Sequence, residues 1–219
     1  MKLKALIVSI KGTKLTNREK ILLKKERPWG IILFKRNLKS FTQIRNLTNQ
    51  IKIITKNKKF PIIIDEEGAN VSRLSNLINH NLSSNFFGDL YKKNKFLSLR
   101  LFKIYITSLS KILKDLGFNV NTIPVLDVLK PYTNKIIGNR SFSKKKEIVK
   151  QLGRVTIKEC RSHKIINVVK HMPGHGCSTA DSHLTLPKVF LSEKNLNKMD
   201  FYPFKSCSAK LAMTAHILY

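Results

Sequence analysis

The residues best suited to chemistry lie in one stretch, from Lys170 to Pro187, with the sequence KHMPGHGCSTADSHLTLP. It combines three histidines, a lysine and an aspartate with turn-forming glycine and proline. Asp181 and His183 are separated by a single residue, so in an extended or looped backbone the carboxylate can hydrogen-bond to the imidazole. Such a bond orients the ring and raises its basicity. The pair therefore predicts a proton shuttle.

A metal site is a second interpretation of the same stretch. His171 and His175 are four residues apart, and Asp181 and His183 could complete a set of ligands. A proline and a glycine lie between the first two histidines, however, so these histidines cannot share one face of a helix. The spacing favours proton transfer, and we expect neither a metal nor a cofactor.

Other polar residues follow the ends of predicted strands. Short apolar runs alternate with amphipathic stretches, which is the pattern of β-α-β units. Strands are predicted at residues 6–10, 30–34, 61–65, 118–126, 165–169 and 210–215, and helices at 17–25, 41–55, 96–116 and 144–163. Asp65, Asp127, Lys170 and His216 come at or just after the last four strands. The carboxyl ends of parallel strands meet on one face, where the active sites of such folds are built, so these residues should lie together.

The alternation predicts an α/β fold with a parallel sheet. Residues 1–219 form one domain in this interpretation, because no linker, repeat or low-complexity segment divides them. An open doubly wound sheet and a closed (β/α)8 barrel both fit. The first strand is not followed by a G-x-G-x-x-G turn, which disfavours a dinucleotide-binding sheet. A TIM-type barrel has eight strands and about 250 residues, so the six predicted strands would make an incomplete one.

The chain is strongly basic, with 42 Lys and Arg against 13 Asp and Glu and a net charge of +29. Such a charge attracts nucleic acid and anionic surfaces. The lysines are spread along the chain among many Asn and Ile, as a compositional bias would produce, although a functional basic surface also fits. Aromatic RNA-stacking motifs and a recognition helix are not evident. We expect no specific nucleic-acid partner.

The cysteines and the N-terminus bear on location. Cys160, Cys177 and Cys207 are odd in number and lack close metal-ligand spacing, which fits free thiols in a reducing compartment. The apolar run after Met1 is too short for a signal peptide, and we expect no membrane span. The cytoplasm is the expected location, and the sequence does not indicate an oligomeric state.

Several segments resemble, in order, the bacterial family 3 glycoside hydrolases of the β-N-acetylglucosaminidase type. Residues 170–183, KHMPGHGCSTADSH, resemble the signature K-H-F-P-G-H-G-x-x-x-x-D-S-H. Residues 64–74, IDEEGANVSRL, are similar to I-D-Q-E-G-G-R-V-x-R-L. Shorter matches are ILFKRN at 32–37, PVLDV at 124–128, GNRSF at 138–142 and MTAH at 213–216. These matches span nearly the whole chain, and the histidine-rich segment is the most specific.

The resemblance implies a (β/α)8 barrel that removes terminal β-linked N-acetylglucosamine with retention of configuration. The family's usual substrates are muropeptide fragments of peptidoglycan, recycled in the cytoplasm. Its acid/base is a histidine partnered by an aspartate, and by motif position these are His183 and Asp181. His183 would protonate the leaving oxygen and then deprotonate the incoming water. The residues implied to hold the sugar are Asp65, Arg73, Arg140, Lys170 and His171.

Two departures from the family pattern stand out. Ala69 and Asn70 replace the second glycine and the following arginine of the I-D-Q-E-G-G-R motif, which removes a cation beside the sugar-binding loop. The family nucleophile is an aspartate in an S-D-D-like segment after the seventh strand. Residues 1–219 contain no such segment, so we expect it beyond Tyr219. The alternative to an active glycosidase is a catalytically dead descendant that binds sugar.

Overall fold

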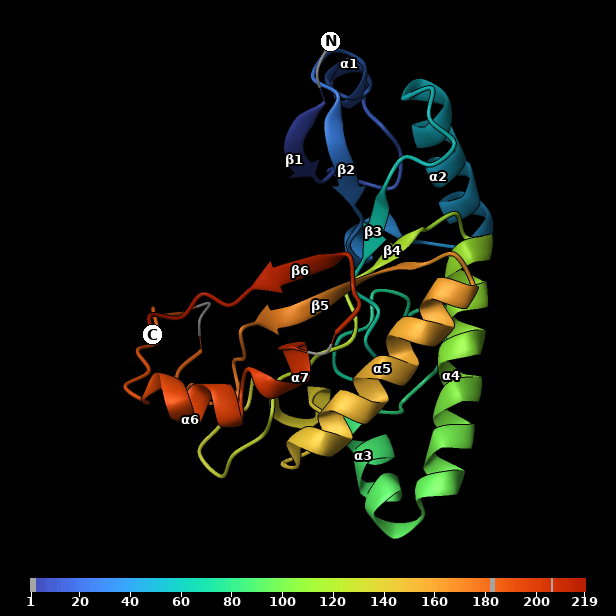
Figure 1. The fold of residues 1–219 in the computed structure, drawn as a ribbon. Helices are drawn as coiled ribbons and strands as arrows, with labels where there is room; N and C mark the ends of the chain where they lie inside the picture. Colours follow the sequence, from blue (N-terminus) through green and yellow to red (C-terminus); the bar gives the residue numbers. More distant parts are fainter. Residues whose placement is uncertain (1–2, 182–183, 206) are drawn as a thin grey trace.

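A single curled sheet of six parallel strands organises the chain (Figure 1). The computed structural model describes residues 3–181, 184–205 and 207–219. Each strand pairs with its neighbours in sequence, in the order β1-β2-β3-β4-β5-β6. The strands are β1 (Lys4–Val8), β2 (Pro28–Ile32), β3 (Ile62–Ile64), β4 (Val120–Asn121), β5 (Ile166–Met172) and β6 (Leu211–Thr214). They form a curled half-barrel, which confirms the predicted incomplete (β/α)8 architecture.

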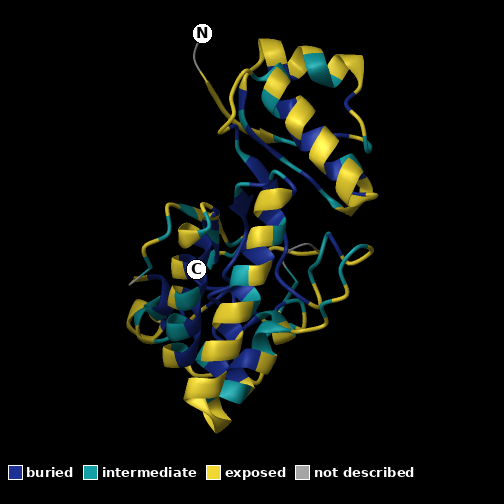
Figure 2. Ribbon diagram, turned by 90° about the vertical axis from the view of Figure 1, so that its right-hand side faces the viewer, coloured by how far each residue is buried: buried dark blue, intermediate teal, exposed yellow. Residues whose placement is uncertain are grey.

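Helices connect the strands and cover the outer face of the sheet. They are α1 (Asn17–Lys25), α2 (Phe41–Ile54), α3 (Ser84–Lys93), α4 (Lys95–Asp115), α5 (Lys146–Ser162), α6 (Glu193–Lys198) and α7 (Tyr202–Lys205), with short 3-10 turns η1 (Lys35–Asn37) and η2 (Gly138–Arg140). Figure 2 shows the outer helices with buried residues on one side and exposed residues on the other. This arrangement is expected for amphipathic helices packed on a sheet. No helix within the described ranges is long and apolar enough to cross a bilayer.

Local sequence explains where the helices begin. Thr16 caps α1 in a capping box with Glu19, and Ser40 and Asn94 cap α2 and α4 by accepting backbone N–H groups. Gly117, at φ +89°, follows α4 and turns the chain into β4. These signals lie close to the helices they limit, which is why most helix bounds could be predicted within two residues.

The fourth predicted strand is much shorter in the structure. Only Val120 and Asn121 form β4, whereas residues 118–126 were expected. Pro124 has no N–H for the ladder, and the chain beyond Asn121 keeps only an isolated bridge between Val125 and Lys170. Helix α3 was missed because Gly88 interrupts its pattern. A Cβ at Gly88 would lie 1.7 Å from the Phe142 carbonyl oxygen, so close packing requires glycine there.

The concave side of the sheet is apolar and open. A groove of about 400 Å³ is lined by strand residues, including Leu6, Trp29, Ile63 and Leu211, and by Thr122. Within the described residues, β1 and β6 are the sheet's two edges and each pairs with one neighbouring strand. Leu6 is 54% exposed. In a closed barrel, further strands would pair with these edges and shield this face.

Candidate active site

Asp65 lies directly after β3, at the carboxyl end of the sheet. Its side chain, 12% exposed, accepts hydrogen bonds from Thr122 Oγ1 and, at 2.9 Å, from Arg73 Nη2. The Lys170 ammonium lies 3.5 Å from Asp65 Oδ1 and donates to Thr122 Oγ1 at 2.8 Å. A carboxylate offers about four lone-pair positions. Asp65 therefore keeps acceptor capacity for hydroxyl groups of a ligand.

Glu67, two residues further along, pairs with two cations. Arg140 binds it in a bidentate manner, with Nε 2.8 Å from Oε2 and Nη2 2.9 Å from Oε1. Lys170 Nζ lies 2.5 Å from Oε1. The Glu67 side chain is 4% exposed, so the two cations rather than water compensate its charge. Through these contacts Glu67 joins η2, which carries Arg140, to β5, which carries Lys170.

Asp127 is fully buried and orients the start of the histidine-rich segment. Its Oδ2 lies 2.7 Å from His171 Nδ1, and its Oδ1 accepts the backbone N–H of His175 at 2.6 Å. Because the carboxylate accepts a hydrogen bond, it favours the neutral His171 tautomer that carries its proton on Nδ1. The opposite nitrogen, Nε2, lies 3.5 Å from Arg140 Nη2. Asp127 thus fixes both the orientation and the tautomer of His171.

The cations of the cluster keep Asp65 and Glu67 ionised. Burial would raise the pKa of Asp65, but Lys170, Thr122 and Arg73 outweigh burial and hold the pKa below its ordinary value. Burial likewise opposes ionisation of Glu67, and Lys170 with Arg140 lowers its pKa nonetheless. Carboxyl groups with lowered pKa values are poor general acids at neutral pH. Their chemistry here is to accept hydrogen bonds and to hold cations.

Burial acts in opposite directions on the pKa values of Asp127 and His175, yet both values are lowered. Burial would raise the pKa of Asp127, but His171 and the His175 N–H outweigh it, so this pKa is lowered. Burial lowers the pKa of His175 despite the nearby carboxylate of Asp127. Asp127 is therefore anionic and His175 is neutral at neutral pH. The carboxylate of Asp127 binds the His171 ring through Oδ2 and the backbone N–H groups of His171 and His175 through Oδ1.

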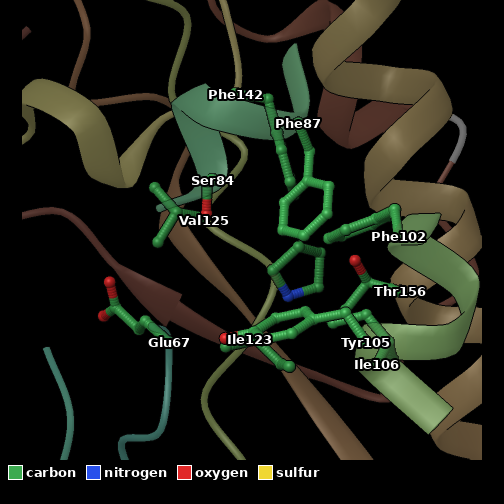
Figure 3. Close-up of a pocket in the computed structure, with 11 residues that line it drawn as sticks. Glu67, Ser84, Phe87, Phe102, Tyr105, Ile106, Ile123, Val125, Phe142 and Thr156 are labelled. Carbon is green, nitrogen blue, oxygen red and sulfur yellow. The ribbon is translucent and has the colours of Figure 1, made fainter. Parts of the chain in front are cut away.

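Packing beneath the cluster is tight. Figure 3 shows Glu67 on one side of a small cavity and an aromatic group on the other. The cavity has a volume of about 10 Å³, close to that of one water probe. Phe87 and Phe102 pack with ring centroids 4.7 Å apart, and Phe142 meets Phe102 edge to face at 5.4 Å. These aromatic side chains and Glu67 line the same cavity.

The replaced motif positions, Ala69 and Asn70, lie at the exposed rim. Asn70 and Asn139 exchange hydrogen bonds between their side-chain amides, and both residues are exposed. The amide pair joins the loop after β3 to η2, next to Arg140. An uncharged amide pair therefore stands where the motif has an arginine. It joins the same two segments as the buried Glu67–Arg140 ion pair.

The histidine-rich segment rests on a second buried ion pair. Lys130 Nζ lies 2.5 Å from Asp200 Oδ1, and the Asp200 side chain is fully buried. Burial raises the pKa of Asp200 even though Lys130 opposes the shift. Gly174 has φ +141°, and a Cβ there would lie 2.9 Å from Asp200 Cβ. Tyr219 donates to the Gly174 carbonyl at 2.5 Å. Glycine is thus required where the segment passes Asp200.

The structure brings together all five residues predicted to hold a ligand. Asp65, Arg73, Arg140, Lys170 and His171 form one continuous set of contacts with Glu67 and Asp127. Asp181 lies near the end of the histidine-rich segment, where its carbonyl accepts the N–H groups of residues 184 and 185. His183 lies outside the described residues, so the predicted Asp181–His183 pair stays a prediction.

Sequence reasoning placed Asp127 among the strand-end residues without giving it a role, and it missed Glu67 and Thr122 as members of the cluster. Glu67 and Asp127 bind the predicted site residues directly, and Thr122 links Asp65 to Lys170. Both acids stood inside matched motifs, IDEEG and PVLDV, and this was the available signal. Among the residues that the structure describes, no group of three or more His, Cys, Asp or Glu side chains is arranged to hold a metal ion.

The whole chain, residues 1–219, matches the family described as "Glycosyl hydrolase family 3 N terminal domain". The chain belongs to this family. A β-hexosaminidase of Nitrosomonas eutropha is 30% identical over 217 residues, covering 98% of this chain and 62% of that protein. β-Hexosaminidase A of Pseudoalteromonas piscicida is 34% identical over 207 residues, and the match covers 87% of this chain and 33% of that protein.

Solved structures agree with this membership of glycosyl hydrolase family 3. NagZ from Neisseria gonorrhoeae superposes with a TM-score of 0.93 at 31% identity, covering 99% of this chain and 64% of that one. A second structure of the same NagZ contains N-trifluoroacetyl-D-glucosamine. This family 3 chain thus spans less than two thirds of the length of these relatives.

Proposed function

We propose that this chain supplies most of a glycoside hydrolase that removes terminal β-linked N-acetylglucosamine. One observation carries the proposal: Asp65, Arg73, Arg140, Lys170 and His171 converge at the carboxyl end of the sheet in a family 3 chain. Relatives named β-hexosaminidase support the activity. The N-trifluoroacetyl-D-glucosamine bound to the gonococcal NagZ supports the sugar.

The chemistry of the cluster fits an uncharged sugar. Asp65, Glu67 and Asp127 supply three negative charges, and Arg73, Arg140 and Lys170 supply three positive ones. Because these charges compensate one another, the cluster does not need a charged ligand to balance it. Asp65 would accept hydrogen bonds from sugar hydroxyls, while Arg and Lys donors would bind hydroxyl and acetamide oxygens.

Proton transfer is assigned to the loop beyond the cluster. In the proposed retaining mechanism His183 protonates the leaving oxygen and later deprotonates water, and Asp181 orients its ring. The lowered pKa values of Asp65, Glu67 and Asp127 support this assignment, because these carboxyl groups would not donate a proton at neutral pH.

We propose that the nucleophile lies in a part of the fold that follows β6. Further βα units would pair with the edges of β1 and β6 and shield the apolar groove. The complete domain would then be a closed barrel, with its nucleophilic aspartate after the seventh strand. Muropeptide fragments in the cytoplasm are the proposed substrates, and the three free cysteines fit a reducing location.

A sugar-binding role without hydrolysis is the second candidate. Asp65, Glu67, Asp127 and the buried Glu66 each accept hydrogen bonds from neighbouring groups. None of these four carboxylates is free to act as a nucleophile. This observation favours binding without turnover for residues 1–219 on their own.

The test is release of the aryl group from an aryl β-N-acetylglucosaminide by a form extended with the remaining βα units. Activity is expected, and His183→Ala should reduce it by at least about 100-fold, the low end for loss of a general acid/base. His163→Ala is the matched control, because His163 follows α5 at the opposite end of the sheet. Equal losses in both variants, or full activity of His183→Ala, would reject the shuttle. Inactivity of the extended form would favour the second candidate.

A further inference from the structure

A second group of titratable side chains lies behind the loop that carries Arg73. Glu66 follows Asp65 in sequence but points away from the cluster, and its side chain is fully buried. Its Oε2 accepts the backbone N–H groups of Arg73 at 2.8 Å and Leu74 at 2.9 Å. Its Oε1 lies 2.7 Å from His80 Nε2. Glu66 is therefore bonded to the segment that begins with Arg73.

The hydrogen-bonded chain continues to a helix. His80 Nδ1 lies 3.2 Å from the hydroxyl of Tyr105, which projects from the middle of α4. With the imidazole proton on Nε2, the hydrogen bonds of the chain run in one direction: Tyr105 O–H donates to Nδ1, and Nε2–H donates to the Glu66 carboxylate. The Ser72 hydroxyl lies further from Nε2, at 3.5 Å. The imidazole thus transmits the position of α4 to Glu66. Figure 3 shows Tyr105 among the aromatic side chains across the cavity from Glu67, and its ring packs against Phe87 with centroids 5.2 Å apart.

The other end of the chain is Arg73 itself. Arg73 donates from Nη2 to Asp65 Oδ2 at 2.9 Å, and its Cζ lies 5.7 Å from the centre of the Phe34 ring. Its backbone N–H is one of the two groups that Glu66 holds. The loop from residue 66 to residue 74 is therefore fixed at its start and at its end by the same buried carboxylate.

We propose that Glu66, His80 and Tyr105 are positioning residues that set Arg73 against Asp65 for sugar binding. This inference rests on the proposed sugar-binding role of Arg73 and Asp65. Position 66 is glutamine in the family motif, and glutamine can accept the two backbone N–H groups equally well. Glutamate makes His80 the hydrogen-bond donor, whereas a glutamine amide facing His80 would require the imidazole to be the acceptor.

Amide hydrogen exchange on the 219-residue chain tests the positioning without any sugar. In the parent chain, the Arg73 and Leu74 amides should be protected. Glu66→Ala should speed their exchange by at least about tenfold, the equivalent of one lost hydrogen bond, while Glu66→Gln should restore most of the protection. Tyr105→Phe should speed exchange by a smaller factor. Tyr91→Phe, at a partly buried tyrosine in α3, is the matched control and should change nothing.

Sugar binding tests the consequence separately. N-acetylglucosamine should bind Glu66→Ala about tenfold more weakly than the parent, by titration calorimetry, and Glu66→Gln should recover affinity. Should Glu66→Ala fail to fold, Tyr105→Phe and Glu66→Gln carry both readouts. Unchanged exchange at Arg73 and Leu74 in Glu66→Ala, or in Tyr105→Phe, would overturn the inference. Faster exchange with no sugar binding in the parent would leave the positioning intact and reject the proposed function.

Discussion

Arg140 and Glu67 form a bidentate ion pair, 73 residues apart in sequence, with Nε–Oε2 and Nη2–Oε1 distances of 2.8 and 2.9 Å. Their side chains are 11% and 4% exposed. The pair joins the loop after β3 to η2, and Lys170 from β5 contacts the same carboxylate. Three separate parts of the chain thus meet on one buried acid.

Breaking this pair should destabilise the fold. Glu67→Gln removes the carboxylate that pairs with Arg140 and leaves Lys170 only its longer contact with Asp65, so the expected loss of unfolding free energy is about 3–5 kcal/mol. Arg140→Lys keeps the charge but loses the bidentate geometry, so about 1.5–3 kcal/mol is expected. Urea unfolding monitored by circular dichroism measures both. Glu26→Gln, which breaks an exposed ion pair with Lys4, is the control and should change little. Equal effects at the buried and exposed sites would contradict the description of the pair.

Stability should fall in acid for a defined reason. Asp65, Glu67 and Asp127 have pKa values below their ordinary ones in the folded chain. Each contributes stability that is fully present above its unfolded pKa, near 4, and that is lost as the pH falls through the lower, folded pKa. The pKa of His175 is also lowered, so its protonation in the unfolded chain should cause a first, smaller fall in melting temperature below about pH 6.5, and the carboxyl groups should cause the main drop below about pH 4.

The Asp127→Asn variant separates this acid effect from general charge repulsion. It should be less stable than the parent at pH 7 and should lose less stability on acidification. Asp115→Asn, at an exposed pair with Arg45, should follow the parent profile. If Asp127→Asn and the parent lost stability in parallel, Asp127 would not be one of the groups responsible.

The same residue should control the tautomer of His171. Asp127 Oδ2 faces Nδ1, so the neutral ring should carry its proton there. Long-range proton–nitrogen correlation spectra report which nitrogen is protonated. In Asp127→Asn, an amide oriented with its NH2 group towards the ring should shift the proton to Nε2. A parent ring already protonated at Nε2 would contradict the assignment.

Much of the fold was predictable because its signals are local. Helices α1, α2, α4 and α5 begin and end within a few residues of the expected positions, since caps and apolar spacing lie inside the segments themselves. Strand β3 is three buried isoleucines, which is typical of a parallel sheet covered on both faces. Short helices α6 and α7 were missed because six and four residues carry too little periodicity.

The site was predictable in part, through its motifs. Asp65 and Lys170 were expected at strand ends and lie there. The ion pair of Glu67 with Arg140 and the bond of Asp127 to His171 join residues 73 and 44 positions apart. No local pattern encodes such contacts, because they arise only when the sheet brings the strand ends together. The link from Glu66 to Tyr105 through His80 was missed for the same reason.

A substitution at Gly174 tests the packing of the histidine-rich segment against Asp200. Gly174→Ala should destabilise the chain by more than about 1 kcal/mol, because alanine is strained at φ +141° and its Cβ would contact Asp200. Gly12→Ala is the matched control, since a Cβ there meets nothing within 4 Å. Urea unfolding of both variants measures the difference. A Gly174→Ala chain as stable as the control would show that the segment adjusts freely.

The central claim is that residues 1–219 hold N-acetylglucosamine through Asp65. Titration calorimetry of the 219-residue chain with this sugar tests the claim most directly. We predict saturable binding in the parent chain and a loss of at least about tenfold in affinity for Asp65→Asn, which removes the charged acceptor. Asp115→Asn should bind like the parent. Equal affinity of the parent and Asp65→Asn, or no binding by the parent, would contradict the account.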